Sequence, residues 1–517
     1  MTVRRFGFVL GLILFSLVAA LPPFQVFVDA AGNTQGVGDA VWQFAASMQF
    51  VLALVLLMVV WWLTEAIPLP ATALLPAVIL PLFHVTGIHE GQTFNFSTRA
   101  VLVNYANPVI FLFLGGFLLA GAMQKWKLDR RFMLWFLTRG NLANDTRLVL
   151  LGIMIVTAFL SMWMSNTATA AMMLPLGLGV LSLLNTRPGE SRYGTAMMLG
   201  IAWAASIGGV GTIIGTPPNG IALGILNTTF AGDPNYHPIT FLKWMAIGVP
   251  YVLFFIPIAW WLLLLTNRPE VTRIEFGKER MLEQQKALGP LSAGEKYTLG
   301  VFILAVVLWV SNPFWEAILP AAFARHVAWI DEYSIGLTIG VLLFLVPVNF
   351  REGTFVLDWR DAHYVDWGTL LLFGGGIALS DAMFKTGLAS WIATSLVGTL
   401  GNPSTFIMLL AIVFLAEMLT EITSNTAITS MMVPVVISIA LRTGEHPVTL
   451  AIGTALGASM AFMLPVATPP NAIVYSTGFV TIRQMARSGF LLDLASWAFT
   501  LLVLVVIGSW LFGITPI

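Results

Sequence analysis

The chain has 517 residues, of which 58% are hydrophobic and 10% are charged, and its formal net charge is zero. This composition lies far from that of an average soluble domain and is typical of a protein embedded in a membrane. The zero net charge gives no indication of nucleic-acid binding, and the lack of cysteine excludes disulfides, thiolate catalysis and cysteine-based metal sites.

Eleven apolar runs are candidates for helices that span a bilayer, which requires about 20 residues each. They lie at 6–28, 41–63, 68–86, 107–124, 195–226, 240–266, 297–312, 333–349, 368–386, 448–478 and 488–513. The first run has a second interpretation as a signal peptide, because Arg4 and Arg5 precede it. We favour a retained span, since the apolar run continues past Ala20.

Two further apolar regions, 147–184 and 404–441, are interrupted in the middle by polar residues. The interruptions share the sequence Ser-Asn-Thr-Ala, at 165–168 and at 424–427. We expect each half to be too short to cross a bilayer, and broken backbone at membrane depth requires a protein or cavity environment. We therefore expect two re-entrant helical hairpins, each entering and leaving on one side. The alternative is that each region consists of two tilted full spans.

Two other features recur in the same order as the interruptions. A Gly-Gly pair occurs at 115–116 and at 374–375, the same 259 positions apart as the Ser-Asn-Thr-Ala motifs. The sequence Thr-Pro-Pro-Asn occurs at 216–219 and at 468–471, 252 positions apart. Each proline lacks an N–H group and forces a break in its span. Three collinear matches with nearly constant spacing predict an internal repeat.

The distribution of basic residues predicts the orientation of the two repeats. With the N-terminus in the cytoplasm, 20 of the 25 Lys and Arg residues fall on the inner side. The predicted division is a first helix with an exterior loop (1–40), repeat 1 with a cytoplasmic-side hairpin (41–266), a cytoplasmic linker containing a solvated helix (267–296), and repeat 2 with an exterior-side hairpin (297–517). Each repeat crosses an odd number of times, so the repeats have inverted topology, a common scaffold for alternating access.

The interrupted segments offer ligands for a cation and for an anion. Hydroxyl groups, asparagine oxygens and carbonyls freed at a helix break are hard oxygen ligands that suit a small hard cation. Helices that restart after a break direct N–H groups towards the centre and attract anions. Neither motif carries Arg or Lys, so bound cations would offset the anion's charge. Asn166 and Asn425 can serve both ions through their amide oxygen and nitrogen. The simpler interpretation is helix capping and close helix packing.

Ionisable residues inside apolar segments require their own explanation. Glu65 and Glu421 are candidates for proton or cation coupling. The simpler interpretation places Glu65 at a membrane interface and gives Glu421 a supporting role in the second hairpin. Asp381 and Lys385 are one helical turn apart and are expected to form an ion pair.

The paired motifs resemble those of the divalent anion–sodium symporter (DASS) family, as does the stretch ASMAFMLPVATPPNAIV at 458–474. The resemblance extends from about residue 61 to the end of the chain. It implies a homodimer in which a fixed scaffold supports a mobile, elevator-type transport domain that contains both hairpins. The amphipathic stretches at 125–145 and 386–400 resemble the interfacial arms of that family.

The resemblance also implies two sodium sites and a substrate site between them. The ligands of the first sodium ion would be Ser161, Ser165, Asn166 and the backbone of Gly215. The ligands of the second would be Thr420, Thr423, Asn425 and the backbone of Ala467. The substrate carboxylates would contact Asn166, Thr167, Thr216, Pro217, Asn425, Thr426, Thr468 and Pro469.

The leading hypothesis is a secondary transporter in the cell membrane that couples sodium to uptake of C4-dicarboxylates such as succinate, malate or fumarate. The alternatives are a sodium-independent dicarboxylate or citrate exchanger and a sodium–sulfate symporter. Family members that only exchange tend to carry a basic residue just after the Asn-Thr-Ala sequence, where this chain has Thr169 and Ile428.

Two other classes of protein fit the sequence less well. An intramembrane enzyme would need a nucleophile–base pair or a metal-ligand cluster, and the sequence indicates neither. A channel would need a continuous polar lining, whereas two breaks approaching from opposite sides favour alternating access. Proton coupling through Glu65 or Glu421 stays open.

Overall fold

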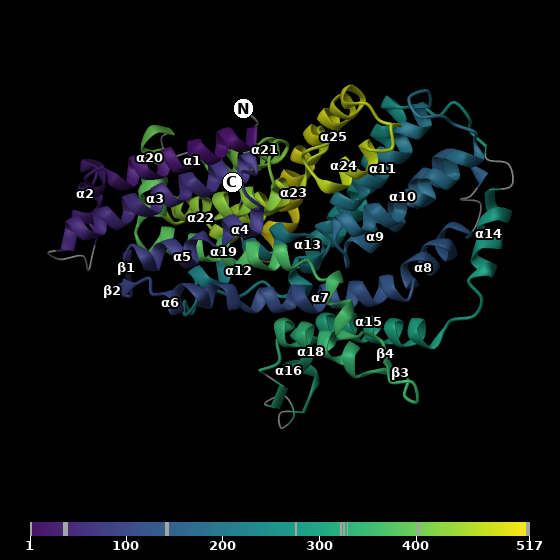
Figure 1. Ribbon diagram of the computed structural model, residues 1–517, viewed down its shortest axis with the longest axis horizontal. Coiled ribbons are helices and arrows are strands. Elements are labelled where there is room, and N and C mark those ends of the chain that lie inside the picture. The colour runs from purple at the N-terminus through teal and green to yellow at the C-terminus, as the bar shows by residue number, and fades with distance from the viewer. Residues whose placement is uncertain are drawn as a thin grey trace.

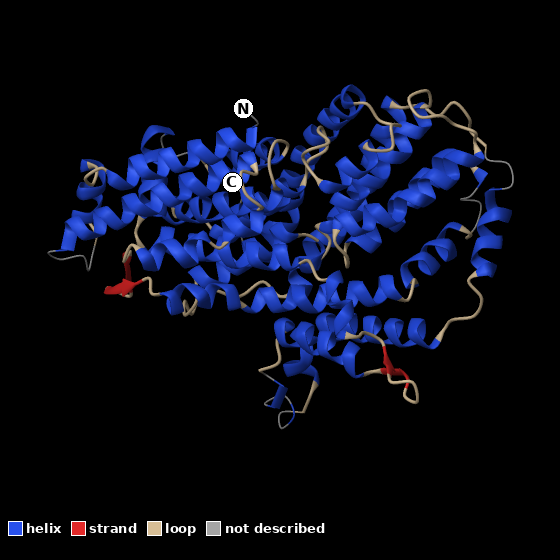
Figure 2. Ribbon diagram, viewed as in Figure 1, coloured by secondary structure: helices blue, strands red, loops and turns tan. Residues whose placement is uncertain are grey.

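The computed structural model describes residues 3–34, 40–139, 144–273, 277–320, 323, 326–327, 329–400 and 404–512. Almost all regular structure in these residues is helical (Figure 2), which confirms the predicted helical class. Two short antiparallel strand pairs lie in loops at distant places in the view, namely β1 (Thr86–His89) with β2 (Gln92–Asn95) and β3 (Pro347–Asn349) with β4 (Thr354–Phe355).

The N-terminal part forms a helical layer at one end of the molecule (Figure 1). It consists of α1 (Val3–Ala20), α2 (Gln25–Gly32) and α3 (Val41–Thr64), and α1 packs along α3. Gln49 of α3 donates hydrogen bonds to the carbonyls of Val18 (2.8 Å) and Leu21 (2.9 Å). These bonds satisfy carbonyl groups that the end of α1 leaves without helical partners.

The rest of the first half contains ten α-helices and two 3₁₀ turns after α3 in the described residues. They are α4 (Leu69–Ala73), α5 (Leu75–Leu82), α6 (Thr98–Leu102), η2 (Val103–Ala106), α7 (Pro108–Lys125), α8 (Leu128–Leu137), α9 (Thr146–Ser161), α10 (Asn166–Leu183), α11 (Arg192–Gly209), η4 (Ile213–Gly215), α12 (Pro217–Thr229) and α13 (Phe241–Thr266), of which η2 and η4 are short 3₁₀ turns.

The linker and the second half follow. The linker contains α14 (Gly277–Ala287), the helix expected there, while its residues 274–276 lie outside the described part. The second half consists of α15 (Ala293–Ser311), η5 (Asn312–Phe314), α16 (Trp315–Ile318), α18 (Glu332–Leu345), η6 (Trp359–Tyr364), α19 (Trp367–Lys385), α20 (Leu388–Leu400), α21 (Thr405–Thr420), α22 (Asn425–Thr443), α23 (Pro447–Ser459), α24 (Pro469–Tyr475), α25 (Ile482–Val503), η7 (Leu504–Gly508) and α26 (Ser509–Phe512).

Nine helical segments in the described residues are long and apolar enough to cross a membrane. They are Val3–Ala20, Val41–Thr64, Pro108–Lys125, Asn166–Leu183, Phe241–Thr266, Ala293–Ile318, Trp367–Lys385, Asn425–Thr443 and Ile482–Leu511. Seven of them match predicted spans, and the other two, α10 and α22, are the second limbs of the predicted hairpins. The structure is therefore that of a polytopic membrane protein.

Four of the eleven predicted spans are not single long helices. The runs 195–226 and 448–478 are each broken before a Pro-Pro pair, as the sequence predicted. The run 68–86 is divided into α4 and α5, and the run 333–349 yields only the 14-residue α18. Prolines explain the division at 68–86, because a proline within a helix removes one backbone donor and crowds the preceding turn.

Both hairpin regions break where the sequence predicted. The first limb ends at Ser161 and the second begins at Asn166, and the corresponding break lies between Thr420 and Asn425. The expectation that every half is too short to span is wrong for α10 (18 residues) and α22 (19 residues). Helix length therefore does not separate a re-entrant hairpin from a pair of full spans, and the re-entrant path stays a prediction.

The duplicated Gly-Gly pairs mark close contacts between helices. A Cβ on Gly115 of α7 would collide with the carbonyl of Gly336 of α18, and one on Gly375 of α19 would collide with that of Ala73. Small residues let helix backbones approach in this way, which supports packing within membranes. The Gly-Gly pairs thus position α7 and α19 rather than bind a ligand.

The two halves interlock at the centre of the molecule. α12, from the first half, packs on α22 and α23 of the second, and α24, from the second half, packs on α10 and α11 of the first. Segments that lie about 250 residues apart in the sequence therefore surround one region. The predicted arms are also helices in the described residues: α8 packs against α9, and α20 packs against α22.

Candidate ion and substrate site

The first break is a short non-helical turn at 162–165, and Ser161, Ser165 and Asn166 lie at or beside it. Ser161 is the last residue of α9 and its side chain is buried. Ser165 caps α10, and its hydroxyl accepts a hydrogen bond from the N–H of Ala168 (3.3 Å). Asn166 then occupies the first position of α10. Serine is a favoured N-cap residue, so the local sequence explains both the break and the restart.

Oxygen atoms gather around Ser161. Its hydroxyl lies 2.8 Å from Oδ1 of Asn166 and 2.6 Å from the carbonyl of Ala205 in α11. One hydroxyl proton cannot satisfy both acceptors, so the cluster has more lone pairs than protons. A Cβ on Gly215 would lie 3.0 Å from the carbonyl oxygen of Ser161 and would collide with that of Gly209. These contacts form a compact cluster of oxygen atoms that suits a small hard cation.

The same arrangement recurs in the second half. The hydroxyl of Thr420, the last residue of α21, lies 2.6 Å from Oδ1 of Asn425 and 2.9 Å from the carbonyl of Ala458. Thr420 and Asn425 occupy the positions that correspond to Ser161 and Asn166. The repeat predicted from the sequence is therefore also a repeat of hydrogen-bond geometry.

Two asparagines that the sequence analysis did not assign to the site tie each broken span together. Nδ2 of Asn219 donates to the carbonyls of Gly209 (3.1 Å) and Thr212 (2.8 Å). Nδ2 of Asn471 donates to those of Ala461 (3.1 Å) and Leu464 (3.0 Å). The Oδ1 atoms of both asparagines are buried and have no hydrogen-bond partner within the described part of the chain. Their presence in the repeated Thr-Pro-Pro-Asn sequence was a signal that could have identified them.

The remaining predicted ligands lie at the same breaks. Gly215 ends η4, Thr216 is the N-cap of α12 and Pro217 begins that helix; Ala467 precedes Thr468, the N-cap of α24, and Pro469 begins it. Thr423 is buried, and its hydroxyl is without a partner among the described residues. Thr167 is exposed and Thr426 is buried at the start of their helices. Their positions agree with the predicted sites, and their binding roles stay predictions.

The described residues contain no group of three or more His, Cys, Asp or Glu side chains that could hold a metal ion. The two clusters consist of hydroxyl, amide and carbonyl oxygens, which carry no net charge. An alkali-metal ion would therefore bring net positive charge to the centre. The cluster carbonyls of Ala205 and Ala458 leave no trace in a sequence, since any residue type can supply a carbonyl.

Comparison with known proteins identifies the family of this chain. The model of the sodium:sulfate symporter transmembrane region matches residues 43–514. The chain belongs to this transporter family. The predicted resemblance to sodium-coupled anion symporters is thereby confirmed, as is the expectation of a transporter rather than an enzyme.

Curated relatives within this family are similar over most of their length. A "Sodium-dependent dicarboxylate transporter SdcS" of Staphylococcus saprophyticus is 38% identical over 463 residues, covering 88% of this chain and 85% of the relative. A protein of the same name from Staphylococcus aureus (strain MRSA252) is 36% identical over 478 residues, covering 90% of this chain and 87% of the relative.

Solved structures with a similar fold are also membrane transporters. The YdaH transporter of Alcanivorax borkumensis has a TM-score of 0.55 at 15% identity, covering 90% of this chain and 99% of that structure. MtrF of Neisseria gonorrhoeae has a TM-score of 0.55 at 12% identity, covering 88% and 97% respectively. At these identities the likeness concerns the fold alone.

Three buried carboxylates, Glu417, Glu421 and Asp493, lie in the second half of this symporter-family chain. Glu421 accepts hydrogen bonds from the N–H groups of Phe462 (2.5 Å), Met463 (2.9 Å) and Leu464 (3.1 Å). It thus holds the broken segment before α24 against the second hairpin, which is the supporting role considered from the sequence. Glu417 is buried beside Ser496, which donates to it, and Asp493 is buried nearby.

Two other ionisable candidates lie outside the oxygen clusters of this symporter-family chain. Glu65 follows the C-terminus of α3, is exposed, and forms a long ion pair with Arg4 (3.7 Å). Asp381 and Lys385 form the expected ion pair (2.8 Å) within α19. Neither pair contacts the two breaks, so neither contributes a ligand to the clusters.

Proposed function

We propose that this chain is a secondary active transporter that couples the inward movement of sodium ions to uptake of C4-dicarboxylates such as succinate, malate or fumarate. The observation that carries the proposal is the duplicated oxygen cluster at Ser161–Asn166 and Thr420–Asn425. Each cluster has surplus lone pairs and would hold one sodium ion as transported cargo. The staphylococcal relatives, which are named as sodium-dependent dicarboxylate transporters, support the same assignment.

The dicarboxylate would bind between the two sodium sites. α10, α22 and α12 each begin at this region, and the first N–H groups of a helix have no helical partner. These groups and the positive ends of the helix dipoles attract carboxylates. None of the eight proposed substrate contacts is basic, so the substrate's two charges depend on bound sodium for compensation. Coupling follows, because the cations create the anion site.

The two inverted halves supply the route for alternating access. In this proposal the scaffold contains α1, α3, α4, α5, α7, α15, α18 and α19, and the moving domain contains both hairpins with α11–α13 and α23–α25. The moving domain would carry the site across the membrane as an elevator. The functional unit would be a homodimer in the plasma membrane, with the N-terminus in the cytoplasm. The predicted division into 1–40, 41–266, 267–296 and 297–517 belongs to this proposal.

The test is uptake of labelled succinate into proteoliposomes that contain the purified full-length chain. An inward sodium gradient should drive accumulation, and an equal potassium gradient should not. Unlabelled malate and fumarate should compete for uptake, whereas citrate and sulfate should compete weakly. Uptake that requires internal dicarboxylate and ignores sodium would make the protein an exchanger. If only sulfate competed, the proposed binding site would still hold, but the substrate would be sulfate and not a C4-dicarboxylate.

A further inference from the structure

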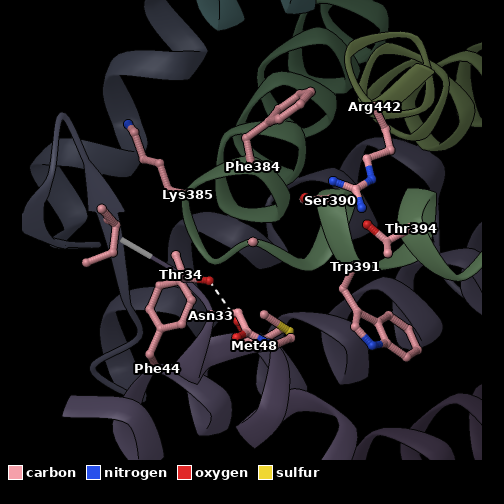
Figure 3. Close-up of a pocket in the computed structure, with 13 residues that line it drawn as sticks. Asn33, Thr34, Phe44, Met48, Phe384, Lys385, Ser390, Trp391, Thr394 and Arg442 are labelled. Carbon is pink, nitrogen blue, oxygen red and sulfur yellow. Dashed lines mark hydrogen bonds between the residues drawn. The ribbon is translucent and has the colours of Figure 1, made fainter. Parts of the chain in front are cut away.

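A cavity of about 660 Å³ lies apart from the oxygen clusters, where five helices of the described chain meet. Figure 3 shows this cavity and the side chains that line it. Its lining comes from the end of α2, the start of α3, the end of α19, the start of α20 and the end of α22. None of its lining residues belongs to the proposed sodium or dicarboxylate sites.

The convergence of helix ends places the cavity at a membrane surface. Asn33 caps the C-terminus of α2, Lys385 ends α19, and Arg442 lies in the last turn of α22. Helices that cross a bilayer end where the hydrocarbon gives way to headgroups and water. Trp391, in the first turn of α20, also lines the cavity, and tryptophan is enriched at this depth.

The cavity has one positive charge without compensation. Lys385 is paired with Asp381 (2.8 Å) and lies 3.8 Å from the centre of the Phe94 ring. Arg442 forms neither an ion pair nor a side-chain hydrogen bond with any residue that the structure describes, and no carboxylate lines the cavity. Figure 3 shows the Arg442 guanidinium directed towards Ser390 and Thr394, while the Lys385 ammonium points away from them.

Part of the cavity wall is apolar, and it consists mainly of Phe44, Met48, Ile88 and Phe384. A ligand that matches the polar and the apolar parts of the wall carries one anionic group that accepts several hydrogen bonds, joined to an apolar part. A guanidinium group with neighbouring hydroxyls is well suited to a phosphate, because arginine donates in a planar fork.

We propose that this cavity binds the headgroup of an anionic phospholipid, with Arg442 and the hydroxyls of Ser390 and Thr394 on the phosphate. A free dicarboxylate fits less well, since its second charge would meet only the neutralised Lys385. Inorganic phosphate would leave the apolar wall without a partner. Basic residues next to a membrane surface recognise anionic headgroups in this way.

The site would connect the second hairpin to its surroundings. α22 begins at Asn425, in the second oxygen cluster, and reaches the cavity at Arg442. The other lining residues belong to α2, α3, α19, α20 and the strand pair. A bound lipid would therefore contact the hairpin and the elements beside it at the same time. The binding itself does not depend on the proposed transport function.

Native mass spectrometry of the full-length chain in detergent tests the proposal, with added phosphatidylglycerol or phosphatidylcholine. The wild type should bind phosphatidylglycerol in preference to phosphatidylcholine. Arg442→Gln should weaken phosphatidylglycerol binding about fivefold, the effect of one basic residue at a lipid headgroup. Arg442→Lys should weaken phosphatidylglycerol binding less than Arg442→Gln does, because lysine retains the positive charge. Arg99→Gln, which removes an exposed arginine outside the cavity, is the matched control and should bind as the wild type does.

Three results would overturn the lipid site. The first is equal phosphatidylglycerol affinity in the wild type and Arg442→Gln, with both proteins folded by circular dichroism. The second is equal binding of the two lipids by the wild type. The third is displacement of phosphatidylglycerol by inorganic phosphate or succinate at matched concentration, which would assign the cavity to a free anion. Because no transport is measured, failure here is distinct from failure of the proposed symport.

Discussion

Asn166 and Asn425 connect the cation clusters to the helices that face the substrate. Each side-chain oxygen lies within hydrogen-bonding distance of the hydroxyl at the end of the preceding helix. Each residue also begins the next helix, so its amide nitrogen and backbone lie at the proposed anion site. One side chain in each half can therefore contact both ions.

We predict that Asn166→Ala and Asn425→Ala each abolish sodium-driven succinate uptake. The substitution removes one ligand of the cation and one donor for the anion, and the two losses reinforce each other. Thermal melting and size-exclusion profiles should stay close to those of the wild type, because both side chains lie at helix starts. Uptake near the wild-type level in either variant would exclude the proposed site. Asn235→Ala, at an exposed turn position outside the clusters, serves as a control.

A buried carboxyl in the first arm predicts a pH effect on stability. Burial raises the pKa of Asp129, in the first turn of α8, to about 6, despite a hydrogen bond from the N–H of Arg130 (2.6 Å). Between about pH 4 and pH 6 the folded state then retains a proton that the unfolded state releases. The free energy of unfolding therefore falls as the pH rises through this window.

Asp129→Asn should remove this part of the pH dependence. The variant should be more stable than the wild type at about pH 7, by roughly 2 kcal/mol, and the difference should vanish near about pH 4. Melting followed by tryptophan fluorescence from about pH 4 to about pH 8 measures the effect. Parallel melting curves for the two proteins across that range would show that Asp129 titrates normally.

At the scale of elements, the local sequence explains where the helices begin and end. The packing of one helix against another decides whether an oxygen cluster forms at each break. Ser165 caps α10 through its hydroxyl, Ser424 occupies the same position before α22 without a capping hydrogen bond, and the Pro-Pro pairs begin α12 and α24. The clusters appear only because α11 and α23 present carbonyls to the hairpins. These contacts are set by helix packing, which sequence periodicity does not specify.

Cysteine labelling tests the inverted orientation of the hairpins, and the natural chain contains no cysteine that would interfere. Glu190→Cys follows the first hairpin and His446→Cys follows the second, and both positions are exposed. A membrane-impermeant thiol reagent should label position 190 only from the cytoplasmic side and position 446 only from the outside. Gln284→Cys in α14 should behave like position 190. Labelling of 190 and 446 from the same side would rule out inverted repeats.

At the scale of the whole molecule, α12 lies between the parts that the proposal treats as fixed and moving. It packs on α7 and α19 on one side and on α22 and α23 on the other. Asn107, just before α7, donates a hydrogen bond to the hydroxyl of Thr228 in α12 (3.2 Å). An elevator movement of α12 past α7 would break this contact in every transport cycle.

A cross-link between these two positions should stop transport. In the chain carrying Asn107→Cys and Thr228→Cys, a short bifunctional thiol reagent should abolish succinate uptake, and each single variant should retain it after the same treatment. Sodium-dependent succinate binding should persist in the cross-linked protein, because both oxygen clusters are left intact. Full uptake by the cross-linked protein would contradict a movement of α12 relative to α7.

The sequence by itself determined the membrane class, the internal repeat, the two hairpin breaks, the linker helix and most residues of the candidate site. These features depend on composition, proline positions and capping residues, which act locally. Only the tertiary structure decided which carbonyls complete the clusters, that Asn219 and Asn471 tie the broken spans together, and that Glu421 holds the segment at 462–464. The reason is physical: backbone oxygens and long-range hydrogen bonds are set by how helices pack, and residue type places little constraint on them.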